Sequence, residues 1–216
     1  MRAEKFLKYQ QEAFSSVYSE PEEGNFHTTL IERVVAHYFD PLNLPRQSVI
    51  LDLGCGQGKF LSEVRNRGYT ALTGVTLSED DFRATQAKGF NARMSDFSDL
   101  DDADASIDLI WCRHCLEHSI FPFVSLREFH RVLRPGGYAY IEVPAPDNDR
   151  LHEANPNHFS ILGLSMWKCL FERAGFAILA ADNFEFDLNL TGNTVREHYF
   201  IFVLRKPPAP AGCILV

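Results

Sequence analysis

The chain has 216 residues, a formal net charge of −8, 45% hydrophobic residues and 23% charged ones, which suits one globular domain with a full core. No apolar run approaches the ~20 residues of a membrane span, and no stretch concentrates Lys and Arg as nucleic-acid binders do. These features argue against a membrane and against nucleic acid as partners, so we expect a small-molecule ligand.

Residues 1–45 are expected to form a helical cap before the first strand. Apolar residues recur at near-helical spacing in two groups, and residues 21–24 separate them. The start of the chain is of mixed charge and lacks the continuous apolar core of a signal peptide. The five cysteines are an odd number at irregular spacing. The N-terminal composition and the cysteine pattern both favour a cytoplasmic protein, and the cysteine pattern favours free thiols.

The first strand and the turn after it carry the main functional signal. The motif SVILDLGCGQG combines a short apolar run, broken only by Asp52, with Gly54, Gly56 and Gly58. Residues 59–67 then have the apolar spacing of a helix with one buried face. A strand, a glycine turn and a helix direct backbone N–H groups and a positive dipole end towards a ligand. We therefore predict a small-molecule cradle here; the alternative is a purely structural turn.

The spacing of the glycines distinguishes two classes of cofactor. A dinucleotide fingerprint has the form G-x-G-x-x-G, whereas here Lys59 takes the place of the third glycine. Residues 52–58, an acidic residue before a G-x-G-x-G turn, instead resemble the first motif of the class I S-adenosylmethionine-dependent methyltransferases. The resemblance implies an α/β fold, a doubly wound and mostly parallel sheet in the order 3-2-1-4-5-7-6 with strand seven antiparallel. It also implies S-adenosyl-L-methionine as cofactor and a small-molecule methyl acceptor.

A second strand is expected over residues 69–75, with Thr76 at its end. In the family an acidic residue at this place accepts hydrogen bonds from both ribose hydroxyls, whereas a threonine hydroxyl can accept a hydrogen bond from only one of them. Glu79 or Asp80 could reach the ribose instead. Both, however, lie where Ser78, with Asp81 three residues on, predicts a helix cap, and capping is the role we favour for them.

The third strand is expected over residues 91–94 and the fourth over residues 107–112. By the resemblance, Asp96 accepts a hydrogen bond from the adenine amino group, and the backbone of Phe97 meets the ring. The full set of cofactor contacts expected in this way is Asp52, Gly54, Cys55, Gly56, Gly58, Thr76, Leu77, Asp96, Phe97 and Cys112.

The sequence CRHCLEH at residues 112–118 is the densest run of reactive side chains. A redox motif could use Cys112 and Cys115, but a thioredoxin fold does not place a glycine-rich strand before it. A zinc site could add His114 and His118, but such sites usually need a second pair of ligands at a distance, so we predict no metal. The third interpretation, which we favour, is the active-site edge of a methyltransferase, because the ending L-E-H resembles that of the family.

Ligands in open α/β sheets bind at the carboxyl ends of the strands. His114 and His118 are therefore candidate acid–base groups, and His158, in a later loop where the family recognises its substrate, is a third. For each of them a packing or hydrogen-bonding role is the alternative. A general base is needed only if the acceptor must lose a proton.

The motif RVLRPGG before an apolar strand resembles a late motif of the family, and it closes a helix in which we expect Phe123 to face inward. The remaining elements are expected to be a helix over residues 122–133, a turn at 134–137, a strand over 138–143, a loop over 144–165, a helix over 166–174 and an antiparallel hairpin with strands 176–186 and 197–205 around a turn at 187–196.

We expect a single domain, with a methyltransferase core over residues 46–206 and a tail over 207–216. The end of the tail, CILV, has the shape of a prenylation box, but Val is an unusual last residue and no polybasic stretch precedes it, so we take the match as chance. The function expected is methyl transfer from S-adenosylmethionine to a small molecule. The alternatives are a methyltransferase-fold module that binds without turnover, which Thr76 favours, and a dehydrogenase, which the glycine spacing disfavours.

Overall fold

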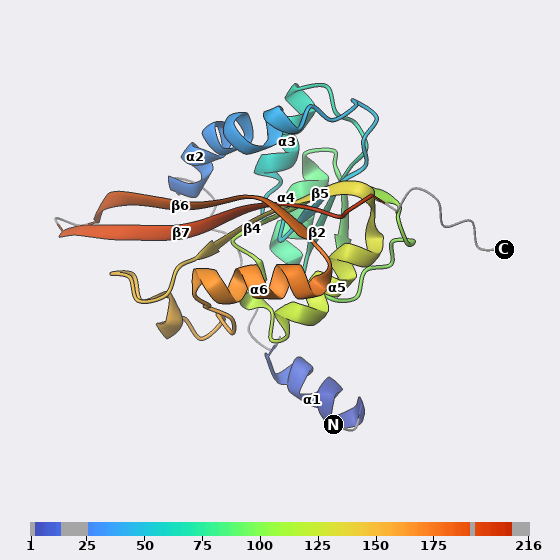
Figure 1. Cartoon of the computed structure of the whole chain (residues 1–216). Coiled ribbons are helices and arrows are strands. Elements are labelled where there is room, and N and C mark those ends of the chain that lie inside the picture. The colour runs from blue at the N-terminus through green and yellow to red at the C-terminus, as the bar shows by residue number, and fades with distance from the viewer. Residues whose placement is uncertain (1–2, 14–25, 191–192, 209–216) are drawn as a thin grey trace.

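The computed structural model describes residues 3–13, 26–190 and 193–208. Strands form one seven-stranded sheet in the order β3-β2-β1-β4-β5-β7-β6, and helices cover both of its faces (Figure 1). The helices and strands are α1 (Ala3–Ala13), α2 (Phe26–Val34), β1 (Ile50–Leu53), α3 (Lys59–Asn66), β2 (Leu72–Thr76), α4 (Glu79–Ala87), β3 (Asn91–Met94), β4 (Ile107–Arg113), α5 (Pro122–Val132), β5 (Leu133–Pro144), α6 (Leu164–Ala174), β6 (Ala177–Leu190) and β7 (Asn193–Arg205).

The predicted strand order is confirmed, as is the antiparallel direction of β7. The strands from β3 to β5 run parallel to one another. Because a parallel sheet is covered on both faces, its central strands read as continuous apolar runs. This is why the run around Asp52 was a reliable signal for β1.

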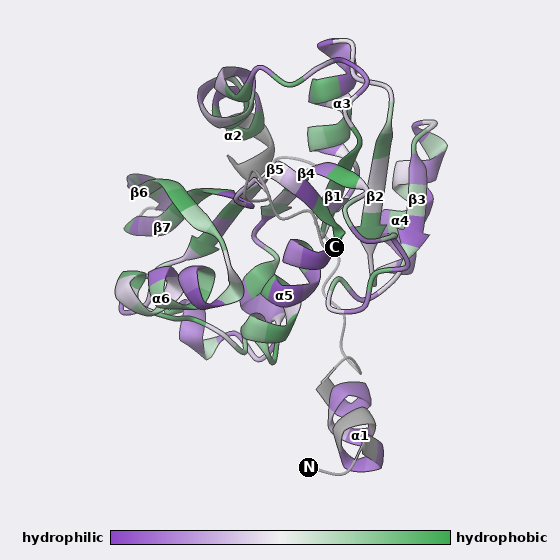
Figure 2. Ribbon diagram, turned by 45° about the vertical axis from the view of Figure 1, so that its right-hand side comes forward, coloured by the Kyte–Doolittle hydropathy of each residue, from purple (hydrophilic) through white to green (hydrophobic). Residues whose placement is uncertain are grey.

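Each face of the sheet has its own core, because alternate residues of a strand point to opposite faces. In β1, Ile50 packs in the core beneath α2 and α3, while Leu51 and Leu53 pack in the core beneath α5 and α6. Figure 2 shows the strands β1 and β2 as largely hydrophobic, whereas α1 is mostly hydrophilic where it is coloured. All of β1 is buried, so its carboxyl end lies in the interior of the molecule.

Helices α1 and α2 differ in how they meet the sheet. In α2, Ile31 and Val34 are buried in the core, and a π-helical turn, Val35–Phe39, continues the same packing. Helix α1 lies at the edge of the molecule (Figure 1), where Gln10 Nε2 donates a hydrogen bond to Asp96 Oδ2 at 2.7 Å. The break predicted at residues 21–24 and the CILV end lie outside the described residues.

The starts of β2 and β5 differ from the expectation by several residues. β2 begins at Leu72, because Tyr69 is held before it: its hydroxyl donates to Leu44 O at 2.9 Å and its N–H to Val64 O at 3.2 Å. β5 already begins at Leu133. The residues 134–137, expected as a turn, lie within this strand as an irregularity where the register with β4 shifts.

The closing hairpin is longer than expected. The residues 187–196 were predicted as its turn, but most of them are paired, with Asp187 opposite Arg196. The guanidinium of Arg196 lies 3.2 Å from the Asp187 carboxylate and 3.7 Å from that of Glu185. Polar cross-strand pairs of this kind extend a hairpin without an apolar signal in the sequence.

In helix α5, one side chain has a different orientation from the predicted one. Phe123 was expected to face inward, but it is 42% exposed, whereas Leu126 and Phe129 are fully buried. Phe123 belongs to the first turn of the helix, beside the exposed side chains of Phe121 and Val124. Among the described residues no helix combines the length and the apolar character needed to cross a membrane.

Candidate functional site

A cavity of about 410 Å³ lies above the carboxyl ends of β1, β2 and β4. This volume is in the range of small-molecule sites, and the position is the one at which open α/β sheets bind ligands. Most of the predicted cofactor residues line it, namely Asp52, Gly54, Cys55, Gly56, Thr76, Leu77 and Phe97. All three candidate acid–base residues line it too: His114, His118 and His158.

The glycine turn after β1 forms the floor of the cavity. Gly54, Gly56 and Gly58 have φ values of +67°, +47° and +72°. Residues other than glycine rarely adopt this backbone conformation. The N–H groups of Gly54 and Cys55 both donate to Val75 O, at 2.9 and 3.1 Å. The turn is thereby fixed against the end of β2.

The predicted helix cap at the end of β2 is confirmed. Ser78 Oγ accepts a hydrogen bond from Asp81 N at 3.2 Å, and Ser78 N donates to Thr76 Oγ1 at 3.0 Å. Glu79 and Asp80 are exposed and lie outside the cavity wall, whereas Asp81 is only 5% exposed and lines it. The acidic side chain at this end of the cavity is therefore Asp81, to which the sequence analysis gave no role beyond the cap.

Three predicted cofactor residues lie outside the cavity wall. Gly58 is the residue before α3, and Cys112 is fully buried in the core. Asp96 Oδ1 accepts from Ser98 N at 2.8 Å, and its other oxygen accepts from Gln10. Asp96 thus lies in the neighbouring loop, beside the cavity-lining Phe97 and in contact with α1.

A buried ionic cluster supports one wall of the cavity. Glu142 of β5 lies 2.9 Å from Arg113 Nε and 2.8 Å from His114 Nε2, and the Tyr140 hydroxyl donates to it. Burial alone would raise the pKa of Glu142, but Arg113 and His114 hold it well below its usual value. Burial lowers the pKa of His114. We infer that His114 serves mainly to hold Glu142, since its Nε2 faces that carboxylate.

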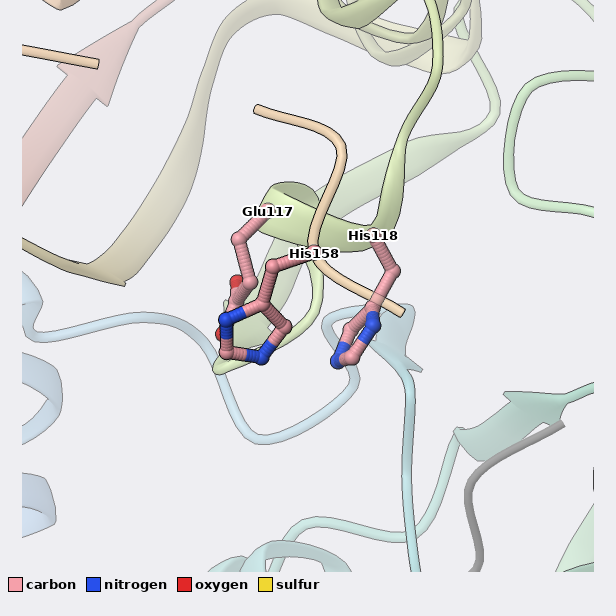
Figure 3. A group of neighbouring side chains, drawn as sticks. All are labelled: Glu117, His118 and His158. Atoms are coloured by element: carbon pink, nitrogen blue, oxygen red, sulfur yellow. The ribbon is translucent and has the colours of Figure 1, made fainter. Parts of the chain in front are cut away.

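The other two histidines meet a buried carboxylate that the sequence analysis did not single out (Figure 3). Glu117 and His118 belong to a 3-10 turn, Leu116–His118, after β4, and His158 lies in the loop before α6. The rings of His118 and His158 are 4.9 Å apart. Glu117 is 2% exposed, and its Oε2 has no hydrogen-bond partner among the described residues.

The ionisation of this cluster is dominated by burial. Burial raises the pKa of Glu117 to about 8 and lowers the pKa of His158 to about 4. Burial also lowers the pKa of His118. The two imidazoles are therefore neutral near pH 7, and each has a nitrogen lone pair.

The two cysteines of the CRHCLEH run are buried free thiols. Cys115 lines the cavity, and a Cβ on Gly54 would lie only 2.6 Å from its Sγ. Cys112 packs beneath it in the core. The side-chain hydrogen bond with Cys112, together with burial, keeps the pKa of Cys115 well above its usual value, so this thiol is protonated and fills space under the glycine turn.

The residues of the cavity fit S-adenosyl-L-methionine. The buried carboxylates Asp52 and Asp81 offer acceptors for hydroxyl and ammonium groups, and Leu77 and Phe97 offer apolar surface for an aromatic base. Gly54 and Gly56 allow a ligand to approach the backbone closely. The remaining wall contains Glu117 and the three candidate histidines.

Comparison with known proteins gives a consistent result. A family model described as "Methyltransferase domain" matches residues 26–181. The chain is 25% identical over 151 residues to 27-O-demethylrifamycin SV methyltransferase of Amycolatopsis mediterranei, covering 62% of this chain and 56% of that protein. It is 26% identical over 153 residues to the ubiquinone biosynthesis O-methyltransferase of Xanthomonas oryzae pv. oryzae, covering 57% and 64%. The chain thus spans little more than half the length of these two relatives.

Solved structures share the fold. A SAM-dependent methyltransferase from Archaeoglobus fulgidus superposes with a TM-score of 0.68 at 19% identity, covering 93% of this chain and 99% of that one. The [4+2]-cyclase SpnF superposes with a TM-score of 0.67 at 17% identity, covering 94% and 93%. At this identity the likeness shows the fold alone.

Proposed function

This chain belongs to the methyltransferase-domain family, and from that premise we propose that it transfers a methyl group from S-adenosyl-L-methionine to a hydroxyl oxygen of a small molecule. The observation that carries the proposal is the 410 Å³ cavity above the glycine turn, with Asp52 and Asp81 buried in its wall. The choice of oxygen as the acceptor atom is supported by the two relatives, whose names both refer to methylation at oxygen.

The two ends of the cavity would hold different reactants, the cofactor and the acceptor. Asp52 and the backbone of the glycine turn would face the methionine part of the cofactor, and Thr76 and Asp81 the ribose. Leu77 and Phe97 would hold the adenine. The acceptor would lie against Glu117, His118 and His158, and Arg150 and Phe159 also line the cavity.

The chemistry demands mainly alignment from the protein. The sulfonium of the cofactor supplies an activated methyl group, and holding the acceptor oxygen in line with it can contribute ~7–11 kcal/mol. If the acceptor hydroxyl must lose a proton, a neutral imidazole is suited to accept it, with a gain of roughly 10²–10⁴-fold. His118 and His158 are better placed for this than His114, which faces Glu142.

The cofactor end is tested with two neighbouring aspartates. We expect Asp81→Asn to weaken S-adenosylmethionine binding by about tenfold, the effect of losing one charge-assisted hydrogen bond. Asp80→Asn removes the same charge from an exposed position and should leave the affinity unchanged. Titration calorimetry measures both, and equal affinities for the two variants would place the ribose elsewhere.

The transfer itself is tested with isotopically labelled methyl donor and a panel of small molecules that offer hydroxyl, amino or carbon acceptors. Labelled ether products would support the proposed reaction. Tight binding of the cofactor with no transfer to any hydroxylated, amino or carbon acceptor would instead favour the module that binds without turnover.

A further inference from the structure

We propose that Glu117, His118 and His158 bind a divalent transition-metal ion in the wall of the cavity. Each residue offers one ligand atom, and these three atoms lie within 4.8 Å of one another. Two ligands at about 2.1 Å from one ion in tetrahedral geometry lie about 3.4 Å apart. Side-chain movements of about an ångström would therefore complete the site.

Glu117 is the strongest indication of a missing partner. Its side chain is 2% exposed, and Oε2 has no hydrogen-bond partner among residues 3–13, 26–190 and 193–208. The carboxylate lies beside the imidazole of His158 and lines the cavity (Figure 3). A buried carboxyl oxygen without a partner is costly unless something else in the site satisfies it. The nearby cation Arg113 is paired with Glu142, and His114 Nδ1 lies 4.0 Å from the other oxygen, Glu117 Oε1, so a bound metal ion would satisfy Oε2.

Both histidines are held as metal-binding histidines usually are. His118 Nδ1 lies 2.8 Å from Asn157 O, and His158 Nδ1 lies 2.9 Å from His152 O. A hydrogen bond from Nδ1–H to a backbone carbonyl fixes the ring and leaves Nε2 as the ligand atom. The Asn155 amide, 3.2 Å from His158 Nε2, would have to give up this contact when an ion binds.

The two segments that carry the ligands are bound to each other. The N–H groups of Phe159 and Ser160 donate to Glu117 O at 2.9 and 3.0 Å, and Ser160 Oγ donates to Ser119 O at 2.7 Å. These bonds join the 3-10 turn after β4 to the loop before α6. The three ligands are thereby positioned before any ion arrives, which reduces the entropy cost of binding it.

The ligand set selects the class of ion. Two imidazoles and one carboxylate suit Mn²⁺, Fe²⁺, Co²⁺, Ni²⁺ or Zn²⁺, whereas Mg²⁺ and Ca²⁺ prefer oxygen ligands. Three protein ligands leave coordination positions open, as in catalytic metal sites. The open side would face the cavity, where an acceptor oxygen could bind. That use of the ion rests on the proposed function, and it would replace His118 and His158 as candidate bases.

The test is a metal titration of the full-length, tag-free and metal-stripped protein, without cofactor or acceptor. We expect one equivalent of Co²⁺, seen by its visible absorption, and one equivalent of Zn²⁺ by calorimetry. Glu117→Gln and His158→Ala should each weaken the affinity by at least about tenfold. His37→Ala, which removes an exposed histidine of the π-helical turn, is the matched control and should bind as the original chain does.

Glu117→Gln also separates loss of the site from loss of the fold. Glutamine has nearly the same size and no charge to bury, so the thermal stability of the metal-free variant should equal or exceed that of the metal-free original. Failure to bind either ion, or equal binding by Glu117→Gln, His158→Ala and the original chain, would overturn the proposal. Titration of S-adenosylmethionine into the metal-free protein tests the proposed function separately, so that either idea can fail alone.

Discussion

Gly54 lies where the molecule has no room for a side chain. A Cβ there would meet Cys115 Sγ at 2.6 Å and its Cβ at 2.8 Å, and φ is +67°. Gly89, after α4, has a similar φ of +79°, but a Cβ there would have nothing within 4 Å. Substitutions at these two glycines therefore distinguish the free-energy cost of a left-handed backbone from that of a steric clash.

We expect Gly54→Ala to lower the free energy of unfolding by about 2–4 kcal/mol, because overpacking adds to backbone strain, and to abolish S-adenosylmethionine binding. Gly89→Ala should cost about 1 kcal/mol and leave binding intact. Denaturant unfolding and calorimetry measure the two effects. If both variants lost the same stability, the close approach of Cys115 would not be the reason for glycine.

The candidate site was predictable only where the chain signals it locally. The glycine turn and the histidines were found because their residue types are informative by themselves. Asp81 and Glu117 were missed because their importance lies in burial, which depends on segments far away in the sequence. The loop with Phe159 and Ser160 buries Glu117, for example, and no local pattern shows that these segments meet.

At the scale of elements, Glu128 joins α5 to the loop after β3. It accepts hydrogen bonds from Arg131 Nη2 at 2.7 Å, from Arg131 Nε at 2.9 Å and from the N–H of Leu100 at 2.8 Å. The Arg131 guanidinium is the main cause that lowers the pKa of Glu128 below its usual value. Because the folded state favours the charged form, Glu128 stabilises the fold at pH values above the unfolded pKa.

We expect Glu128→Gln to lower the free energy of unfolding by about 0.5–1 kcal/mol at pH 7, the size expected for a partly exposed pair. This difference should shrink as the pH falls through the lowered pKa of Glu128, since the original side chain is then neutral as well. Urea unfolding at a series of pH values checks the trend. A difference that stayed constant between pH 7 and pH 3 would mean that packing, and not charge, is responsible.

At the scale of the whole molecule, the cavity joins elements from both halves of the chain, so its ligand should stabilise all of them together. A ligand at 100 times its dissociation constant adds about 2.7 kcal/mol. For a chain of this size we therefore expect S-adenosylmethionine to raise the melting temperature by roughly 5–10 °C. Thermal unfolding with and without the cofactor measures the shift, which Gly54→Ala should lack. No shift at saturating cofactor would count against the site.

The fold was more predictable than its details. β1 to β4 and α6 carry continuous apolar or periodic signals, and their positions along the chain were predicted from them, whereas the strand order was predicted from the resemblance to the family. The start of β5 and the length of the β6–β7 hairpin were not, because those pairs are made by backbone bonds and by polar partners such as Asp187 and Arg196. The exposure of Phe123 was not predicted, because its spacing of three residues from Leu126 is the same as that between the buried residues Leu126 and Phe129.

The position of β7 has a consequence for biosynthesis. This strand comes last among the described elements, yet it lies between β5 and β6 and pairs with both. While a ribosome still holds Asn193–Arg205, β5 and β6 each present an unpaired backbone edge to the surroundings, and such edges recruit other chains. We therefore expect the nascent protein to be most prone to aggregation just before its last strand emerges.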